Sequence, residues 1–295
     1  DRELAGLPGS FDVLVVDDGS SEPTPAASVP TFQAIRRVEM LRLRRNLGHQ
    51  RALAVGLCFL VGERTGRGIL VMDGDGEDRP SDVSRLIPPN GADGEPHVTF
   101  AERVRRTEGV VFTVFYHSYR MCHRILTGIP VRMGNFSYLP WQLASRLVVC
   151  GELWNHYAAA VVASRTEYRL VPCPRGHRVR GRSKMGVVAL VTHGLSAIAV
   201  FSDRVGVRVL SATAVASVLA VLGLLLVLAL RCCTQLAIPG WATAAGGLLV
   251  VFLGELALLS VLFTFVVLAG RNRPTVIPFR DYHYFIEGAT ALWPK

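Results

Sequence analysis

The feature that most restricts this chain is a charge-free stretch of sequence from Val209 to Leu230. At a rise of ~1.5 Å per residue, a helix of this length is about 33 Å long, and the hydrocarbon core of a bilayer is ~30 Å thick. A second apolar stretch, Trp241 to Ala269, carries Glu255 as its single charge. Two buried core helices are the alternative, but no further polar-faced helices remain to cover them. The two stretches therefore predict a pair of membrane spans.

The positive charges around these stretches predict their orientation. Arg204 and Arg208 precede the first stretch, and Arg271, Arg273 and Arg280 follow the second. The hairpin between the two stretches holds only Arg231. Positive residues are retained on the cytosolic side. We therefore expect a multi-pass protein of the inner cell membrane with both termini cytosolic. No signal peptide is recognisable at the N-terminus, which agrees with a cytosolic soluble domain.

The rest of the 295-residue chain reads as soluble sequence, enough for one sizeable domain. We expect a domain over 1–184, an interfacial helix and juxtamembrane segment over 185–208, two spans within 209–270 and a cytosolic tail over 271–295. The net charge of +9 fits a domain that lies near an anionic membrane or handles phosphates. No basic helix with interleaved aromatic residues is seen, so nucleic acid is not an expected partner. The six cysteines have no C-x-x-C spacing, which supports neither a zinc site nor a disulfide framework.

Strand and helix patterns alternate along the soluble part. Apolar runs at 11–16, 68–73 and 97–103 read as strands. Residues 47–63 and about 109–126 read as helices, and a third helix start stands at Pro80. This alternation predicts an α/β fold with mainly parallel strands.

Two of the predicted strands end in acidic residues. "VLVVDDGSS" places Asp17 and Asp18 after the first strand, and "MDGDGEDRP" places Asp73, Asp75 and Glu77 after the second. Ligands of open α/β sheets gather at the carboxyl ends of strands. Alternating carboxylates suit Mg²⁺ or Mn²⁺, which share their coordination with phosphates and water. A polar turn is the alternative interpretation, since Asp and Gly are turn residues; the spacing of a calcium-binding loop is not met.

Several motifs in order give a more specific indication. "VVDDGSS", "NLGHQRALAVGL" and "MDGDGEDRPSDV" resemble the family 2 glycosyltransferases of GT-A fold, most of all the branch of dolichyl-phosphate mannose synthases and polyprenyl-phosphate glycosyltransferases. The likeness extends through "RVRRTEG", "VRMGNFSYLP" and "RGRSKM" to the two apolar stretches. It implies a Rossmann-like nucleotide-sugar domain followed by a two-helix membrane anchor. In that family a further strand and a P-x-Y-N-E loop precede the DDGS strand, where only ten residues stand before Phe11.

The resemblance implies a role for each matching position. Asp17, Asp18 and Gly19 would bind the base and ribose of a nucleotide sugar, with Asn46, Gly48 and Arg51 forming the adjoining wall. Asp73 and Asp75 would be the D-x-D pair that holds a divalent cation, with Asp75 as the firmest ligand. Glu77 stands where relatives often have Gln. Ordinary alternatives remain for several positions, because Asp18 can cap a turn, Asn46 and Gly48 can start a helix, and Arg51 can be a solvated charge.

Basic residues complete the implied site. Arg103 and Arg106 follow the third strand, and Arg132 precedes a predicted "GNFS" turn. Arg180, Ser183 and Lys184 match a phosphate-binding loop of the family, and arginine forks grip phosphate oxygens well. Relatives often have G-D-F-R where this chain has Asn135, which cannot act as a base. That loss is tolerable for a phosphate acceptor, since a phosphate with a second pKa of about 6 is mostly dianionic at neutral pH.

The resulting expectation is a metal-dependent glycosyltransferase that moves a sugar from a nucleotide-sugar donor to a polyprenyl phosphate at the cytosolic face of the cell envelope. Another lipid or a glycan as acceptor is the second hypothesis, although the Q-x-x-R-W motif of processive synthases does not occur. A non-catalytic membrane scaffold is the third. Glu255 and His193 receive no catalytic role, and pairing of Glu255 across a homo-oligomer is left open.

Overall fold

The computed structural model describes residues 1–21, 31–88, 95–103, 110–130, 133–174, 176, 187–234, 240–271 and 276–293. The chain divides into two compact units. The α/β unit comprises residues 1–120, 130–200 and 275–295, and the helical unit comprises residues 121–129 and 201–274.

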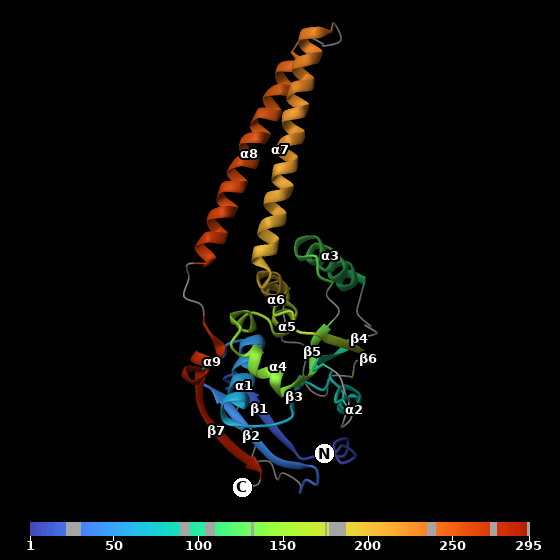
Figure 1. The fold of residues 1–295 in the computed structure, drawn as a ribbon, viewed down its shortest axis with the longest axis vertical. Helices are drawn as coiled ribbons and strands as arrows, with labels where there is room; N and C mark the ends of the chain where they lie inside the picture. The colour runs from blue at the N-terminus through green and yellow to red at the C-terminus, as the bar shows by residue number, and fades with distance from the viewer. Residues whose placement is uncertain are drawn as a thin grey trace. The chain divides into compact units, whose positions relative to one another are not determined.

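One sheet of the α/β unit is built from three strands in the order β1-β2-β7 (Figure 1). β1 (Phe11–Asp17) runs parallel to β2 (Ile35–Leu43), and β7 (Ile286–Trp293) pairs antiparallel with β2. β1 therefore lies at an edge of this sheet. The strand that the resemblance places before Phe11 stays a prediction.

The other sheet has four strands in the order β3-β5-β4-β6. β5 (Met133–Pro140) pairs antiparallel with both β3 (Gly68–Val71) and β4 (Val98–Arg103), whereas β6 (Tyr168–Cys173) is parallel to β4. The expectation of mainly parallel strands is therefore wrong, because β5 and β7 both enter their sheets antiparallel. The α/β class itself is confirmed.

The "GNFS" segment is not the turn that the sequence analysis expects. Gly134, Asn135, Phe136 and Ser137 lie inside β5, and the last three are buried. Extended backbone is favoured here because Phe136 and Tyr138 point to one hydrophobic cluster while Leu139 joins the other. The strand brings Asn135 to one end of the four-stranded sheet.

α1 (His49–Glu63) connects the cores of the two sheets. Ala52, Val55 and Phe59 pack with Leu41 and Leu43 of the three-stranded sheet. Other α1 residues join the larger core of the four-stranded sheet, together with α4 (Trp141–Leu147), η2 (Gly151–Trp154) and α5 (Tyr157–Ala163): Ala54, Leu57 and Cys58. A helix that is apolar on nearly all sides is a buried helix, as "ALAVGLCFLVG" predicts.

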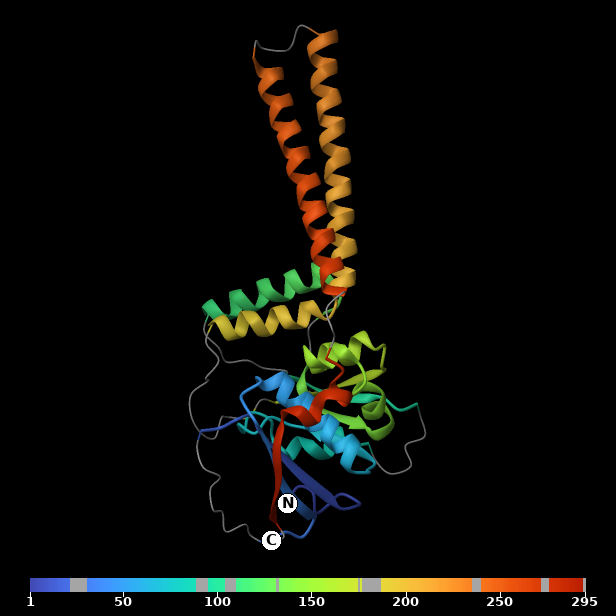
Figure 2. The ribbon, with the colours of Figure 1, turned by 90° about the vertical axis from the view of Figure 1, so that its left-hand side faces the viewer.

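The segment after the second span belongs to the α/β unit rather than forming a separate tail. α9 (Pro278–Asp281) and η3 (Tyr282–Phe285) lie beside α1 (Figure 2) and lead into β7. The amide of Phe279 donates to the carbonyl of Val148, and the Tyr282 hydroxyl donates to Glu63. Residues 276–293 thus complete the three-stranded sheet, whereas the sequence predicted a tail over 271–295 outside the domain.

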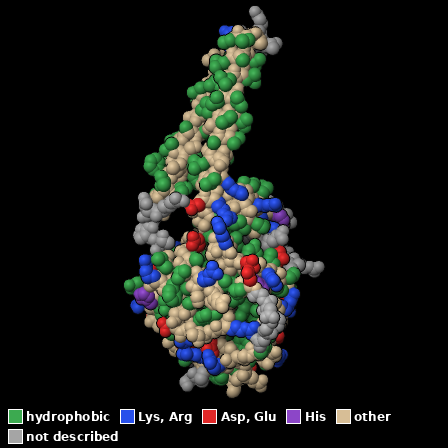
Figure 3. Space-filling view, in the orientation of Figure 1, with side chains coloured by type: hydrophobic (Ala, Val, Ile, Leu, Met, Phe, Trp, Pro, Cys, Tyr) green, Lys and Arg blue, Asp and Glu red, His purple; other side chains and the backbone are tan. Residues whose placement is uncertain are grey.

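The helical unit contains two helices that are long and apolar enough to cross a membrane, α7 (Ser202–Cys233) and α8 (Trp241–Arg271). Only 17% and 6% of their most apolar windows are buried, which does not fit core helices of a soluble protein. Hydrophobic side chains gather over their surface in Figure 3. One polar contact joins them, since the Ser260 hydroxyl donates to Thr213 Oγ1 over 3.1 Å. These helices indicate membrane association.

Two further helices precede the hairpin in sequence. α3 (Val110–Thr127) runs close to its expected limits, and α6 (Val187–Ala199) forms where the interfacial helix is predicted. Short η1 (Pro80–Asp82) and α2 (Val83–Leu86) follow the acidic loop, beginning at the expected proline.

Candidate functional site

The acidic pair after β1 is held by hydrogen bonds within the protein. Asp17 accepts from the amide of Ser20 and from the guanidinium of Arg42. Burial alone would raise the pKa of Asp17, but these hydrogen bonds outweigh it and the pKa lies below its ordinary value. Asp18 accepts from the amides of Leu47 and Gly48, over 2.7 and 2.9 Å. Asp18 therefore fixes the loop that starts α1.

Glycines make this loop possible. Gly19 has a φ of 69°, and a Cβ there would lie 2.7 Å from the backbone of Arg45 and Asn46. Gly48, with a φ of 87°, is the N-cap of α1. Both positions need backbone conformations that other residues adopt rarely. The "DDGS" and "NLG" segments thus pack directly against each other.

The acidic loop after β3 is organised by its own backbone. The amide of Asp73 donates to the buried carboxylate of Asp78, and the amide of Glu77 donates to Asp75. The carbonyl of Glu77 accepts from the amide of Gly176. Asp73 and Asp75 are both partly exposed, so their carboxylates face a region that a ligand can reach.

His49 joins the two acidic loops. It follows Gly48, which Asp18 holds, and its Nε2 atom lies 3.4 Å from Asp73 Oδ1 and 2.6 Å from Asn135 Nδ2. In the antiparallel pairing of β3 with β5, Val71 lies opposite Ser137. Asp73, two residues after Val71, and Asn135, two residues before Ser137, therefore share the same end of the sheet. The structure brings Asp18, Asp73 and Asn135 to the surroundings of one residue, His49.

A chain of hydrogen bonds fixes the orientation of this histidine. The amide of Tyr157 donates to Gln50 Oε1, so the Gln50 Nε2 group faces Asn135 and donates to its Oδ1. The Asn135 Nδ2 group is then turned toward His49 and lies 2.6 Å from its Nε2 atom, a contact in which the amide nitrogen is the donor.

Two more histidines lie close by. The rings of His156 and His193 are 4.8 Å apart, and His156 Nδ1 accepts from the amide of Ala159 at the start of α5. Burial lowers the pKa of His193 below its ordinary value; His49 lowers it further, and Asp73 acts in the opposite direction. His193 of α6 therefore lies near His49 and Asp73, at the acidic end of the sheet.

Other predicted residues are placed elsewhere or fall outside the described chain. The Arg51 guanidinium lies 5.6 Å from the ring centre of Trp154, and the Asn46 side chain is exposed. Arg103 ends β4 at the acidic end of its sheet, but its side chain is outside the described part. Four further arginine and lysine positions and one serine lie outside the described residues altogether: Arg106, Arg132, Arg180, Ser183 and Lys184.

The donor set of the second loop fits a hard divalent cation. Among the described residues, no group of three or more His, Cys, Asp or Glu side chains lies together as a complete metal site. Mg²⁺ is commonly held by one or two carboxylates, with phosphate and water oxygens filling the remaining positions. Asp73 and Asp75 are oxygen donors of this kind, and both are accessible.

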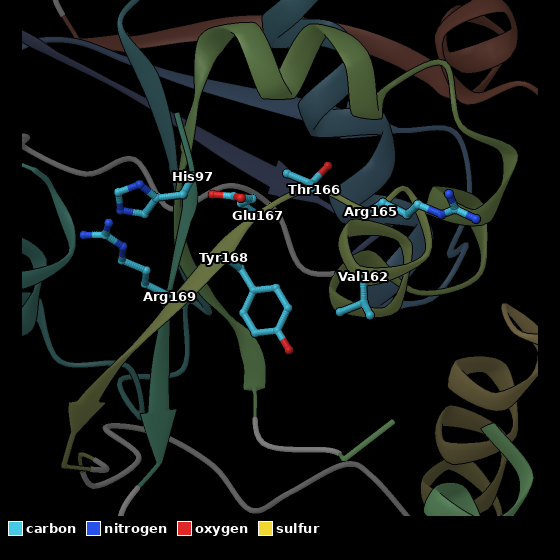
Figure 4. A pocket seen from close by; sticks show the side chains of 7 residues that line it. All are labelled: His97, Val162, Arg165, Thr166, Glu167, Tyr168 and Arg169. Atoms are coloured by element: carbon cyan, nitrogen blue, oxygen red, sulfur yellow. The ribbon is translucent and has the colours of Figure 1, made fainter. Parts of the chain in front are cut away.

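A hollow seen in Figure 4 lies away from these residues. It is lined by residues at the starts of β4 and β6 and from the segment between α5 and β6: His97, Val162, Arg165, Thr166, Glu167, Tyr168 and Arg169. β3 and β4 both run antiparallel to β5, so they point the same way. Asp73 follows the end of β3, whereas the hollow is at the opposite end of the sheet. It is not part of the candidate site.

His49, Gln50 and His156 were not predicted as site residues from the sequence, and no role was expected for His193. His49 and Gln50 stand inside the quoted "NLGHQRALAVGL" motif, and a polar pair at the start of an apolar helix is a recognisable signal. His193 is the one ionisable residue of α6, which is otherwise apolar apart from Thr and Ser. Their meeting with Asp73 depends on tertiary packing.

Comparison with known proteins adds an independent indication. An alignment at 23% identity joins the chain to the uncharacterized glycosyltransferase YkcC of Bacillus subtilis, over 79% of this chain and 72% of that protein. Another, at 26% identity, joins it to the uncharacterized glycosyltransferase sll0501 of Synechocystis sp., over 28% of this chain and 25% of that protein. Residues 4–137 match the family model of glycosyl transferase family 2, which includes β1, the acidic loops and Asn135. This part of the chain is therefore similar to the glycosyl transferase family 2 domain, and the similarity indicates a glycosyltransferase.

Proposed function

We propose that this protein is a membrane-bound, metal-dependent glycosyltransferase that moves a sugar from a nucleotide-sugar donor to a polyprenyl phosphate at the cytosolic face. The main support is the meeting of the two acidic loops at His49 within the matched family 2 domain. The two apolar helices that follow suit an acceptor whose head group lies at a membrane surface.

The donor would bind between the two acidic loops. Asp17 and Asp18 are proposed to contact the base and ribose, with Asp18 also keeping residues 47 and 48 in position for α1. Asp73 and Asp75 would hold the divalent cation. When bound, that cation neutralises negative charge on the donor diphosphate and on the departing nucleoside diphosphate.

The acceptor assignment rests on Asn135. The amide oxygen of Asn135 accepts a hydrogen bond from Gln50, and its amide nitrogen contacts His49. Neither atom can remove a proton. A dianionic phosphate needs no base. Its oxygen forms the new bond to the anomeric carbon, while the bond from that carbon to the donor diphosphate breaks and the diphosphate leaves with the electron pair.

The connection of the chain supports the proposed orientation in the membrane. It leaves the α/β unit before α7, and residues 276–293 after α8 return to that unit. Two spans between these points put both ends of the hairpin on the side of the α/β unit. The arginine-rich flanks then favour the cytosolic side.

The test uses full-length protein in membranes with labelled nucleotide sugars and polyprenyl phosphate. We expect labelled lipid that disappears with a chelator, returns with Mg²⁺ or Mn²⁺, and is lost in Asp75→Asn. Asp12→Asn is the matched control. Asp12 lies on the same strand as Asp17 and forms a surface ion pair with Arg36 of β2.

Three outcomes would contradict parts of the proposal. Labelled glycan without labelled lipid would favour a glycan acceptor. Transfer that survives complete chelation would remove the metal. The absence of transfer to any acceptor, with nucleotide-sugar binding also absent, would favour a non-catalytic scaffold.

A further inference from the structure

His49 lies at the candidate site with only part of its ring engaged by the protein. Its Nε2 atom lies 2.6 Å from Asn135 Nδ2 and 3.4 Å from Asp73 Oδ1. Among the described residues, no hydrogen bond involves the other ring nitrogen, Nδ1. The His49 side chain is 49% exposed, so a ligand can reach the ring.

The neighbouring Asn135 is not open to a ligand in this way. It is buried, and its amide oxygen accepts from Gln50 Nε2 over 3.1 Å. Gln50 is itself fixed, because its oxygen accepts from the amide of Tyr157 over 2.7 Å. These contacts turn the amide nitrogen of Asn135 toward His49. At this point of the site, the side chain that a ligand can touch is His49 rather than Asn135.

The direction of these hydrogen bonds favours one form of the imidazole. An amide nitrogen can only donate, so the 2.6 Å contact with Asn135 uses His49 Nε2 as an acceptor. A neutral imidazole that accepts at one nitrogen carries its proton on the other. This arrangement favours an N–H donor at Nδ1 of His49.

The ligand chemistry near His49 follows from its contact with Asp73. Under the proposed function, Asp73 and Asp75 hold a divalent cation whose remaining positions are filled by phosphate and water oxygens. Phosphate oxygens gathered at Asp73 come close to the ring of His49 as well, because the two side chains are 3.4 Å apart. A hydrogen bond from an N–H group to an anionic oxygen is stronger than one between neutral groups.

We infer that His49 is a catalytic residue of the proposed transfer and donates a hydrogen bond from Nδ1 to a phosphate oxygen of a substrate. The inference rests on the proposed function. Asn135 and Gln50 act through His49 as positioning residues, since they fix the side of the ring that carries Nε2. The donor diphosphate and the polyprenyl phosphate offer the same phosphate oxygens, and the experiment distinguishes these two sources.

Substitutions of His49 test which ring atom acts. The amide nitrogen of asparagine lies near the place of histidine Nδ1, that of glutamine near the place of Nε2, and both are donors. His49→Ala, His49→Asn and His49→Gln are compared as full chains in membranes, with labelled nucleotide sugar and polyprenyl phosphate. His97→Ala is the matched control, because His97 is partly exposed and lies at the opposite end of the sheet.

We expect His49→Ala and His49→Gln to lower kcat/KM by about 10- to 100-fold, the range for a lost hydrogen bond to a charged group. His49→Asn and His97→Ala should stay within about threefold of the wild type, because both retain the donor. Thermal unfolding midpoints in detergent should be similar for the three His49 variants. A midpoint lowered equally in all three, with equal losses of activity, would indicate a structural role and overturn the inference.

Binding of UDP or GDP in the presence of Mg²⁺, measured by calorimetry, separates the two phosphates. Weaker binding to His49→Ala assigns the hydrogen bond to the donor diphosphate. Unchanged binding with a raised KM for polyprenyl phosphate assigns it to the acceptor.

Three results would overturn the inference. The first is wild-type transfer that all three His49 variants match, which leaves the proposed function intact. The second is rescue by His49→Gln instead of His49→Asn, which would make Nε2 the donor rather than Nδ1. The third is a wild type that neither transfers sugar nor binds a nucleoside diphosphate, which would overturn the proposed function as well.

Discussion

The two acidic strand ends of the α/β unit use their carboxylates differently. After β1, Asp17 and Asp18 accept hydrogen bonds from Ser20, Arg42 and the amides of residues 47 and 48. After β3, the buried Asp78 takes the structural role by accepting from the amide of Asp73. The carboxylate of Asp73 accepts no backbone hydrogen bond from the described residues and faces His49.

This difference distinguishes carboxylates that stabilise the fold from a carboxylate that is available for catalysis. A carboxylate that already accepts two backbone amides is costly to remove, because both donors lose their partner. A carboxylate that the fold does not use can be changed with little effect on folding. The first pair is therefore expected to matter for stability and position, and Asp73 for activity.

The largest effect is expected for Asp73→Asn. Glycosyl transfer should fall by about 100-fold or more, because the charge that balances the cation is lost. The thermal unfolding midpoint in detergent should stay near that of the wild type. A midpoint lowered as far as in Asp18→Ala would show that Asp73 supports the fold, and would erase the contrast between the loops.

Asp18→Ala is expected to lower the stability of the protein, which Asp73→Asn should leave nearly unchanged. Loss of its carboxylate leaves the amides of Leu47 and Gly48 without their acceptor, which should destabilise the α/β unit by about 1–3 kcal/mol. Asp18→Asn retains one acceptor oxygen and should recover part of this loss. Thermal or denaturant unfolding measures both variants. Equal midpoints for Asp18→Ala and wild type would show that the hydrogen bonds from Leu47 and Gly48 do not stabilise the unit.

Asn135→Ala should have a smaller effect on activity than Asp73→Asn. Its side chain positions His49 and contacts Gln50, so a loss of about tenfold or less in kcat is expected with a modest loss of stability. Steady-state kinetics with labelled donor measures this. A loss as large as that of Asp73→Asn would mean that Asn135 touches the reacting groups.

The smallest effect concerns pH. Because the pKa of Asp17 is lowered in the folded protein, its contribution to stability is present above its ordinary pKa of about 4 and is lost as the pH falls through the lowered value. The difference in unfolding midpoint between wild type and Asp17→Asn should therefore shrink from pH 7 to pH 3. Arg42→Gln should remove part of this difference. A gap that is independent of pH would show that the Asp17 charge is not involved.

Much of the fold could be predicted from local patterns. The apolar runs that became β1, β3 and β4, the helices α1 and α3, and the two long helices were all indicated by composition and spacing. β2 and β7 were not. β2 alternates buried residues with arginines, and β7 is mostly exposed and forms by pairing with a strand more than two hundred residues earlier. Local sequence carries little information about such distant pairing.

The site could be predicted by residue type but not by role. Acids at strand ends indicated where a ligand binds, yet the sequence does not say which carboxylate oxygens are already occupied. Asp18 and Asp73 look alike in sequence and differ only once residues 47–49 are packed between them. The orientation of His49 likewise depends on Tyr157, which is 108 positions later.

The return of the chain after α8 has a consequence for biosynthesis. β2 gains its antiparallel neighbour only when residues 286–293 have left the ribosome, after both long helices have been made. The nascent domain must therefore wait, with one edge of β2 open, while the hairpin enters the bilayer. A chain that ends before α7, made to obtain a water-soluble enzyme, would leave that edge of β2 permanently unpaired. An unpaired strand edge promotes aggregation.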